Sequence, residues 1–173
     1  MISRRFFLKA LITAAVYYPI KGVYAYQTPD RILNMYNIHT GERFSETYYS
    51  SGVYDQHAMD QINYFLRCHY TNEVIPIDMK VIDLLCDIKN MLGGNKEITI
   101  ISGYRSNIYN RLLRSLGRHV SKKSMHIKGR AIDFTIKGFD NRKLARIAKS
   151  FKAGGVGKYS EFVHIDTGRL RYW

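Results

Sequence analysis

Cysteine, proline and acidic residues are scarce in this sequence of 173 residues. It contains 2 cysteines and 3 prolines, and its 14 acidic residues stand against 27 lysines and arginines, for a formal net charge of +13. Cys68 and Cys86 do not form a CxxC pair, which argues against a cysteine-based zinc site. Either a disulfide or two buried free thiols would fit them. The shortage of acidic residues favours anionic partners.

A hydrophobic run long enough to span a membrane is also missing from the N-terminal region. The apolar stretch at residues 10–18 is shorter than the ~20 residues that a transmembrane helix needs. It follows Arg4 and Arg5 in a pattern that matches a twin-arginine export signal, and residues 23–25, Val-Tyr-Ala, suit a leader peptidase. We therefore expect residues 1–25 to be a twin-arginine signal peptide, with no stable membrane insertion after its cleavage.

The remaining residues, 26–173, have the length of one compact domain. The expected signal carries four basic residues and no acidic ones, so the mature net charge would be +9. An exported basic protein meets anionic cell-wall polymer rather than nucleic acid. We expect a monomer in the periplasm.

Hydrophobic periodicity predicts an alternation of strands and helices in the mature chain. The expected strands span residues 31–38, 43–49, 97–101, 130–136, 162–166 and 169–173, and the first two form a hairpin. The expected helices span residues 57–69, 78–92, 106–115 and 141–151. Residues 117–123 form a basic loop, where substrate contacts are expected to concentrate.

Two histidines and an aspartate form a candidate metal site. His126 lies in a loop, and Asp133 follows on a strand whose alternation points it away from the core. His164 and Asp166 share one face of a terminal strand. Two imidazoles and one carboxylate suit zinc and leave a fourth position for water. Zinc lowers the pKa of that water to ~7, which indicates hydrolytic chemistry.

Three ordered motifs extend this pattern. They are Ser102-Gly103-Tyr104-Arg105-Ser106, Ser124-x-His126-x-x-Gly129-x-Ala131-x-Asp133 and Glu161-x-x-His164. Together they resemble the zinc D-alanyl-D-alanine carboxypeptidase family, whose relatives include the VanX and VanY dipeptidases and murein endopeptidases. The segments at residues 33–42 and 154–173 are similar to its YcbK-like, or MepK-like, branch, so the resemblance covers nearly all of the mature chain.

The resemblance implies an α+β fold, in which helices pack on a small antiparallel sheet and a cleft holds one catalytic zinc. The ligands would be His126, Asp133 and His164, and Ser124 would steady a ligand or its loop. Arg105 would stabilise the oxyanion as water adds to the scissile carbonyl.

The catalytic base has two candidates. Glu161 matches the family's base, but on a regular strand it would face away from His164, so it needs a turn or bulge to reach the metal. Asp166 shares the face of His164 and is the rival. The other four histidines, His39, His57, His69 and His119, fit no ligand position.

The sequence thus predicts a zinc peptidase that cleaves amide bonds in the peptide crosslinks of peptidoglycan. A D-Ala-D-Ala carboxypeptidase or dipeptidase is an alternative on the same site. The other alternative is a non-catalytic murein-binding envelope protein, for which the intact ligand set would have no use.

Overall fold

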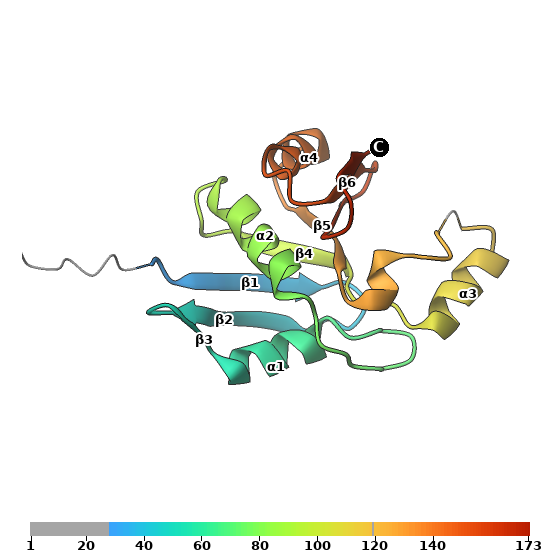
Figure 1. Ribbon diagram of the computed structural model, residues 1–173, viewed down its shortest axis with the longest axis horizontal. Coiled ribbons are helices and arrows are strands. Elements are labelled where there is room, and N and C mark those ends of the chain that lie inside the picture. The colour runs from blue at the N-terminus through green and yellow to red at the C-terminus, as the bar shows by residue number, and fades with distance from the viewer. Residues whose placement is uncertain (1–27, 119) are drawn as a thin grey trace, which may run out of the picture.

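The computed structural model describes residues 28–118 and 120–173. The expected signal peptide, residues 1–25, and His119 lie outside this part of the chain. One eight-stranded sheet organises the fold in the order β3-β2-β1-β4-β5-β7-β6-β8 (Figure 1). The strands are β1 (Arg31–Asn37), β2 (Arg43–Ser50), β3 (Val53–Tyr54), β4 (Glu97–Ser102), β5 (Ala131–Ile136), β6 (Gly155–Lys158), β7 (Val163–Asp166) and β8 (Arg171–Tyr172).

The combination of helices with a sheet agrees with the expected class, but the sheet is neither small nor purely antiparallel. β1 and β2 form the predicted antiparallel hairpin. However, β1 also pairs in parallel with β4, and β6 pairs in parallel with β8. Parallel neighbours are joined by a crossover and not by a tight turn, so the local pattern of the sequence does not reveal them.

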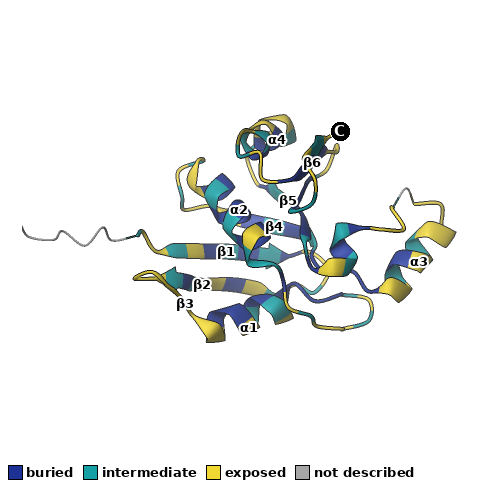
Figure 2. Cartoon of the chain, in the orientation of Figure 1, coloured by how far each residue is buried: buried dark blue, intermediate teal, exposed yellow. Residues whose placement is uncertain are grey.

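Four helices accompany the sheet, namely α1 (Gln56–Phe65), α2 (Met79–Asn90), α3 (Asn107–Ser115) and α4 (Asn141–Ser150). Each begins at a capping side chain that accepts a backbone N–H, and these caps are Asp55, Asp78, Ser106 and Asp140. α1, α2 and α4 contact the strands and bury apolar faces, whereas α3 extends away from the sheet and buries only Asn110 (Figure 2).

Two elements near the site were not predicted. A short 3-10 helix, η1 (Met125–Lys128), stands where a loop was expected, and β6 stands where only the end of a helix was expected. Glycine is rare in strands, so the Gly-Val-Gly-Lys sequence of β6 only weakly predicts a strand. Gly157 lies so close to Trp173 that a Cβ there would be 2.6 Å from the indole. The strand therefore depends on contacts with distant residues.

Cys68 and Cys86 are buried free thiols, so no disulfide joins them. In residues 28–118 and 120–173, no helix combines the length and the apolar character that crossing a bilayer would require.

A hydrogen-bond clamp joins the start of α2 to the strands that carry the candidate site. Asp78 Oδ2 accepts from Thr167 Oγ1 at 2.7 Å and from Arg130 Nε at 3.0 Å. Arg130 Nη2 also donates to the carbonyl oxygen of Thr167 at 2.6 Å. The backbone N–H of Asp78 donates to Gly129 O at 2.9 Å. The clamp fixes the chain just before β5 against the chain just after β7.

This clamp predicts a difference between two helix-capping aspartates. Asp140 caps α4 from an exposed position, so Asp140→Ala should lower the free energy of unfolding by about 1 kcal/mol, the usual cost of a lost cap. Asp78→Ala should cost about 2 kcal/mol, because it also removes the partly buried hydrogen bonds from Thr167 and Arg130. Urea unfolding measures both values, and equal losses would show that the clamp adds nothing to the cap.

Candidate metal centre

Asp133 and His164 face each other across two neighbouring strands. In the antiparallel pair β5–β7, Asp133 is the register partner of His164. Side chains of directly opposed residues lie on the same face of a sheet. Asp133 Oδ1 is 2.7 Å from His164 Nδ1, and both side chains are almost fully buried.

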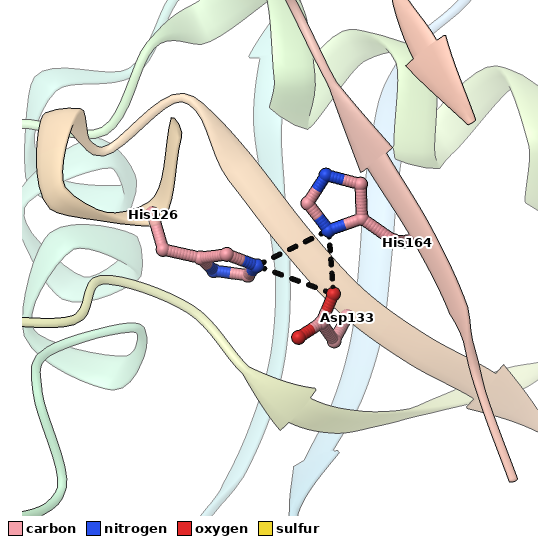
Figure 3. Close-up of side chains that lie close together, drawn as sticks. All are labelled: His126, Asp133 and His164. Atoms are coloured by element: carbon pink, nitrogen blue, oxygen red, sulfur yellow. Dashed lines mark hydrogen bonds and ion pairs between the residues drawn. The ribbon is translucent and has the colours of Figure 1, made fainter. Parts of the chain in front are cut away.

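His126 completes the cluster from η1. Ser124 caps this short helix by accepting the backbone N–H of His126, and Gly129 ends it with a left-handed φ of 63°. His126 Nε2 lies 3.2 Å from both Asp133 Oδ1 and His164 Nδ1 (Figure 3). The structure therefore brings together the three residues that the sequence singled out as metal ligands, and Ser124 lies at the start of the helix that carries one of them.

The outer ring nitrogens of both histidines contact acceptors that orient the rings. His126 Nδ1 is 2.7 Å from the carbonyl oxygen of Gly103, and His164 Nε2 is 3.0 Å from Asp166 Oδ2. A ring proton on each of these outer nitrogens would satisfy its acceptor. His126 Nε2, His164 Nδ1 and Asp133 Oδ1 converge on one another, and a cation could take the place of the proton that His164 Nδ1 shares with Asp133 Oδ1 at 2.7 Å. Such a group could hold a metal ion.

The electrostatics of the cluster favour positive charge at its centre. Burial alone would lower the pKa of His164, but hydrogen bonds and charge interactions with Asp133 and Asp166 outweigh it and raise that pKa. Burial lowers the pKa of His126, which keeps its imidazole neutral at neutral pH. Burial alone would raise the pKa of Asp133, but charge interactions and hydrogen bonds with His126 and His164 outweigh it and hold that pKa well below its usual range. Asp133 is therefore a carboxylate, ready to bind a cation.

A cavity of about 580 Å³ opens over the cluster. Its lining includes residues of the segment between α3 and η1, of the turn after β6 and of the end of the chain from β8 onward. The basic loop 117–123, where the sequence predicted substrate contacts, supplies part of the lining, whereas Met125, Phe162, Arg171 and Trp173 were not predicted. The residues that line it are Arg105, Arg118, Val120, Ser121, Lys123, Ser124, Met125, His126, Asp133, Tyr159, Phe162, His164, Arg171 and Trp173.

Comparison with known proteins gives the family of the chain. Residues 25–173 match the family described as peptidoglycan L,D-endopeptidase MepK. The chain belongs to the MepK family. Peptidoglycan L,D-endopeptidase MepK of Escherichia coli K12 is 42% identical to it over 145 residues, which cover 83% of this chain and 80% of the relative. The probable MepK of Haemophilus influenzae is 40% identical over 146 residues, covering 83% and 78%.

Arg105 lies beside the cluster, as its place in the family motif suggested. Its side chain is almost fully buried, and Nη2 is 3.5 Å from Asp133 Oδ2 and 3.3 Å from Ser102 Oγ. Its Nε makes no hydrogen bond to a described residue. The backbone N–H of Arg105 donates to His126 O, which ties the guanidinium to the site. Arg105 thus keeps donor capacity for a bound group.

Glu161 does not reach the cluster in this MepK-family chain. The required turn is present, because Tyr159 N donates to Phe162 O across it, but Glu161 is exposed at its tip. It does not line the cavity. The expectation that Glu161 is the base is therefore not supported. Glu161 lies in a turn outside β7, where its spacing of three residues from His164 does not determine which way its side chain points.

Asp166 reaches His164 but from the side opposite to the cavity. Its two oxygens accept from the backbone N–H groups of Gly155 and Gly168 and from both terminal nitrogens of Arg171, in addition to His164. These donors hold the pKa of Asp166 far below its usual range, although burial alone would raise it. The geometry supports Asp166 as the residue that orients His164, in place of the expected role as a rival base.

This orienting role predicts a specific loss of metal affinity. Replacing such an outer partner typically weakens metal binding 10- to 100-fold, so Asp166→Asn should bind Co²⁺ that much more weakly than the parent chain. The visible absorption of bound Co²⁺, followed in a titration against a chelator, measures the change. Asp140→Asn, at an exposed cap that asparagine also satisfies, is the control. Unchanged affinity in Asp166→Asn would contradict the role.

Proposed function

We propose that this chain is a zinc-dependent endopeptidase that hydrolyses amide bonds in the peptide crosslinks of peptidoglycan. The observation that carries the proposal is the convergence of two imidazoles and one carboxylate in the lining of a cavity. The substrate follows from membership of the MepK family, whose relatives are named peptidoglycan L,D-endopeptidases. A purely structural murein-binding protein would have no need for such a costly buried cluster.

Zinc fits the donor set better than the hard cations do. Calcium and magnesium prefer six or more oxygen ligands, whereas this cluster offers two nitrogens and one oxygen. Tetrahedral bonds of 2.0–2.1 Å would place ligand atoms about 3.3 Å apart. The three atoms here are separated by 3.2, 3.2 and 2.7 Å, so small side-chain shifts would accommodate the ion.

The residues of the site would have different roles in hydrolysis. His126, Asp133 and His164 would hold the zinc, which supplies a water activated at neutral pH. Arg105 would donate to the oxygen of the scissile carbonyl as negative charge develops on it, from a buried position that requires little rearrangement. Gly103 O and Asp166 would keep the two imidazoles in their binding orientation.

The role of Arg105 predicts a loss of turnover without loss of metal. Removal of one oxyanion donor typically lowers kcat about 10²- to 10³-fold, so Arg105→Lys, which lacks the planar donor fork, should fall by about that factor. Zinc content should stay at one per chain. Mass analysis of muropeptides released from sacculi measures the rate and identifies the bond that is cut, which separates an endopeptidase from a carboxypeptidase.

Glu161→Gln serves as the matched control for that experiment. Because Glu161 lies outside the cavity, its variant should release muropeptides at the rate of the parent chain. A positioned general base contributes about 10²- to 10⁴-fold, so a fall of that size would restore Glu161 to the mechanism.

We also propose that the protein reaches the periplasm by the twin-arginine route, since its proposed substrate is a polymer of the cell envelope. The support is the arginine pair and the short apolar stretch of the leader. Replacing Arg4 and Arg5 together by lysine should abolish accumulation in the periplasmic fraction, measured by immunoblot. Undiminished accumulation would rule this route out.

A further inference from the structure

The cavity over the cluster has an uneven distribution of charge. Four cationic side chains line it, Arg105, Arg118, Lys123 and Arg171, and Asp133 is the single carboxylate among the described residues that do so. With a divalent ion bound to Asp133, the excess of positive charge would be larger still. A cavity of this kind favours a substrate that carries negative charge close to the bond that is cut.

Two of these four cations already have acidic partners. Arg171 pairs with Asp166 at 2.6 Å, and Arg105 lies 3.5 Å from Asp133. Arg118 and Lys123, by contrast, make no ion pair in the part of the chain that the structure describes, and both are exposed. They are the cations that remain available to a ligand.

The backbone that carries Arg118 and Lys123 is held in place. Arg118 N donates to Leu113 O at 2.9 Å, which anchors it to the end of α3. Asn110 is buried, and its Nδ2 donates to Ser121 O at 3.1 Å. Lys123 N donates to Ser121 Oγ at 3.1 Å, and the chain then enters η1 with its ligand histidine. These bonds hold the backbone from which the two cationic side chains extend.

Tyr159, Phe162 and Trp173 also line the cavity. Tyr159 and Phe162 stack with ring centroids 4.5 Å apart, and Trp173 Nε1 donates to Tyr159 OH at 2.9 Å. The Trp173 ring also lies 5.4 Å from that of His164. A peptide in the cavity would therefore meet both aromatic rings and unpaired cations, and its negatively charged groups are expected to contact the cations.

We propose that Arg118 and Lys123 form a carboxylate subsite, which binds a free carboxylate of the substrate peptide beside the scissile amide. The inference rests on the proposed function and names a specificity determinant for it. The fork of Arg118 matches the geometry of a carboxylate, and Lys123 adds a second charge-assisted donor. A peptide in which that carboxylate is an amide would leave the cations unpaired.

A matched pair of substrates tests the subsite. One is a synthetic crosslinked stem-peptide dimer with free carboxylates, and the other is the same dimer with those carboxylates amidated. The zinc-loaded parent chain should prefer the free acid roughly 10-fold in kcat/KM, mainly through KM. In the double variant Arg118→Gln, Lys123→Gln, that ratio should fall close to one.

A second double variant controls for general electrostatic attraction. Arg114 and Lys122 are exposed cations of the same region that do not line the cavity. Arg114→Gln with Lys122→Gln removes the same charge and should retain the preference for the free acid. If both double variants lose the preference equally, the effect is long-range attraction and the carboxylate subsite is wrong.

The failure of the subsite and the failure of the proposed function give different results. Equal hydrolysis of both dimers by the parent chain overturns the subsite and leaves the peptidase standing. If neither dimer is hydrolysed, the proposed function fails, and binding to the His126→Ala variant still tests the subsite. Calorimetry on that variant should find the free acid bound roughly 10-fold more tightly than the amide, and equal affinities would overturn the inference.

Discussion

The Asp133 carboxylate is buried on the central strand β5, in contact with His126, His164 and Arg105. Burying an ionised carboxylate without hydrogen-bond or charged partners destabilises a fold by several kcal/mol. The partner groups of Asp133 must therefore be held in fixed positions around it. Those groups come from η1, from β7 and from the segment after β4. The positions of all three elements are therefore constrained by a single buried charge.

The partners of Asp133 depend in turn on close backbone contacts. The Gly103 carbonyl that orients His126 lies where a Cβ would be 2.5 Å from Leu66 O. The Asp166 carboxylate that orients His164 is enclosed by Gly155 and Gly168, where a Cβ would also collide with it or with Arg171. Glycine is required at these positions because the outer partners of the histidines must approach backbone very closely.

The sequence predicted the parts of this arrangement that depend on local pattern. Alternation along β5 separated Ile132 and Phe134 from Asp133, and the order of the motifs brought the two histidines to it. The sheet's size was missed because the parallel pairing of β1 with β4 joins segments about sixty residues apart. Alternation also placed Asp166 on the face of His164. However, Asp166 accepts hydrogen bonds from Arg171 and from backbone N–H groups, and no local sequence pattern predicts these contacts.

The cross-strand placement of Asp133 and His164 also links the chemistry of the site to the pairing of the sheet. Strand side chains alternate between faces, so a slip of one residue between β5 and β7 would send one of the two to the opposite face. In a chain paired in the wrong register, Asp133 and His164 would be separated and the site would be lost completely. If the cluster binds its ion, only correctly aligned strands would gain the stability that the ion confers.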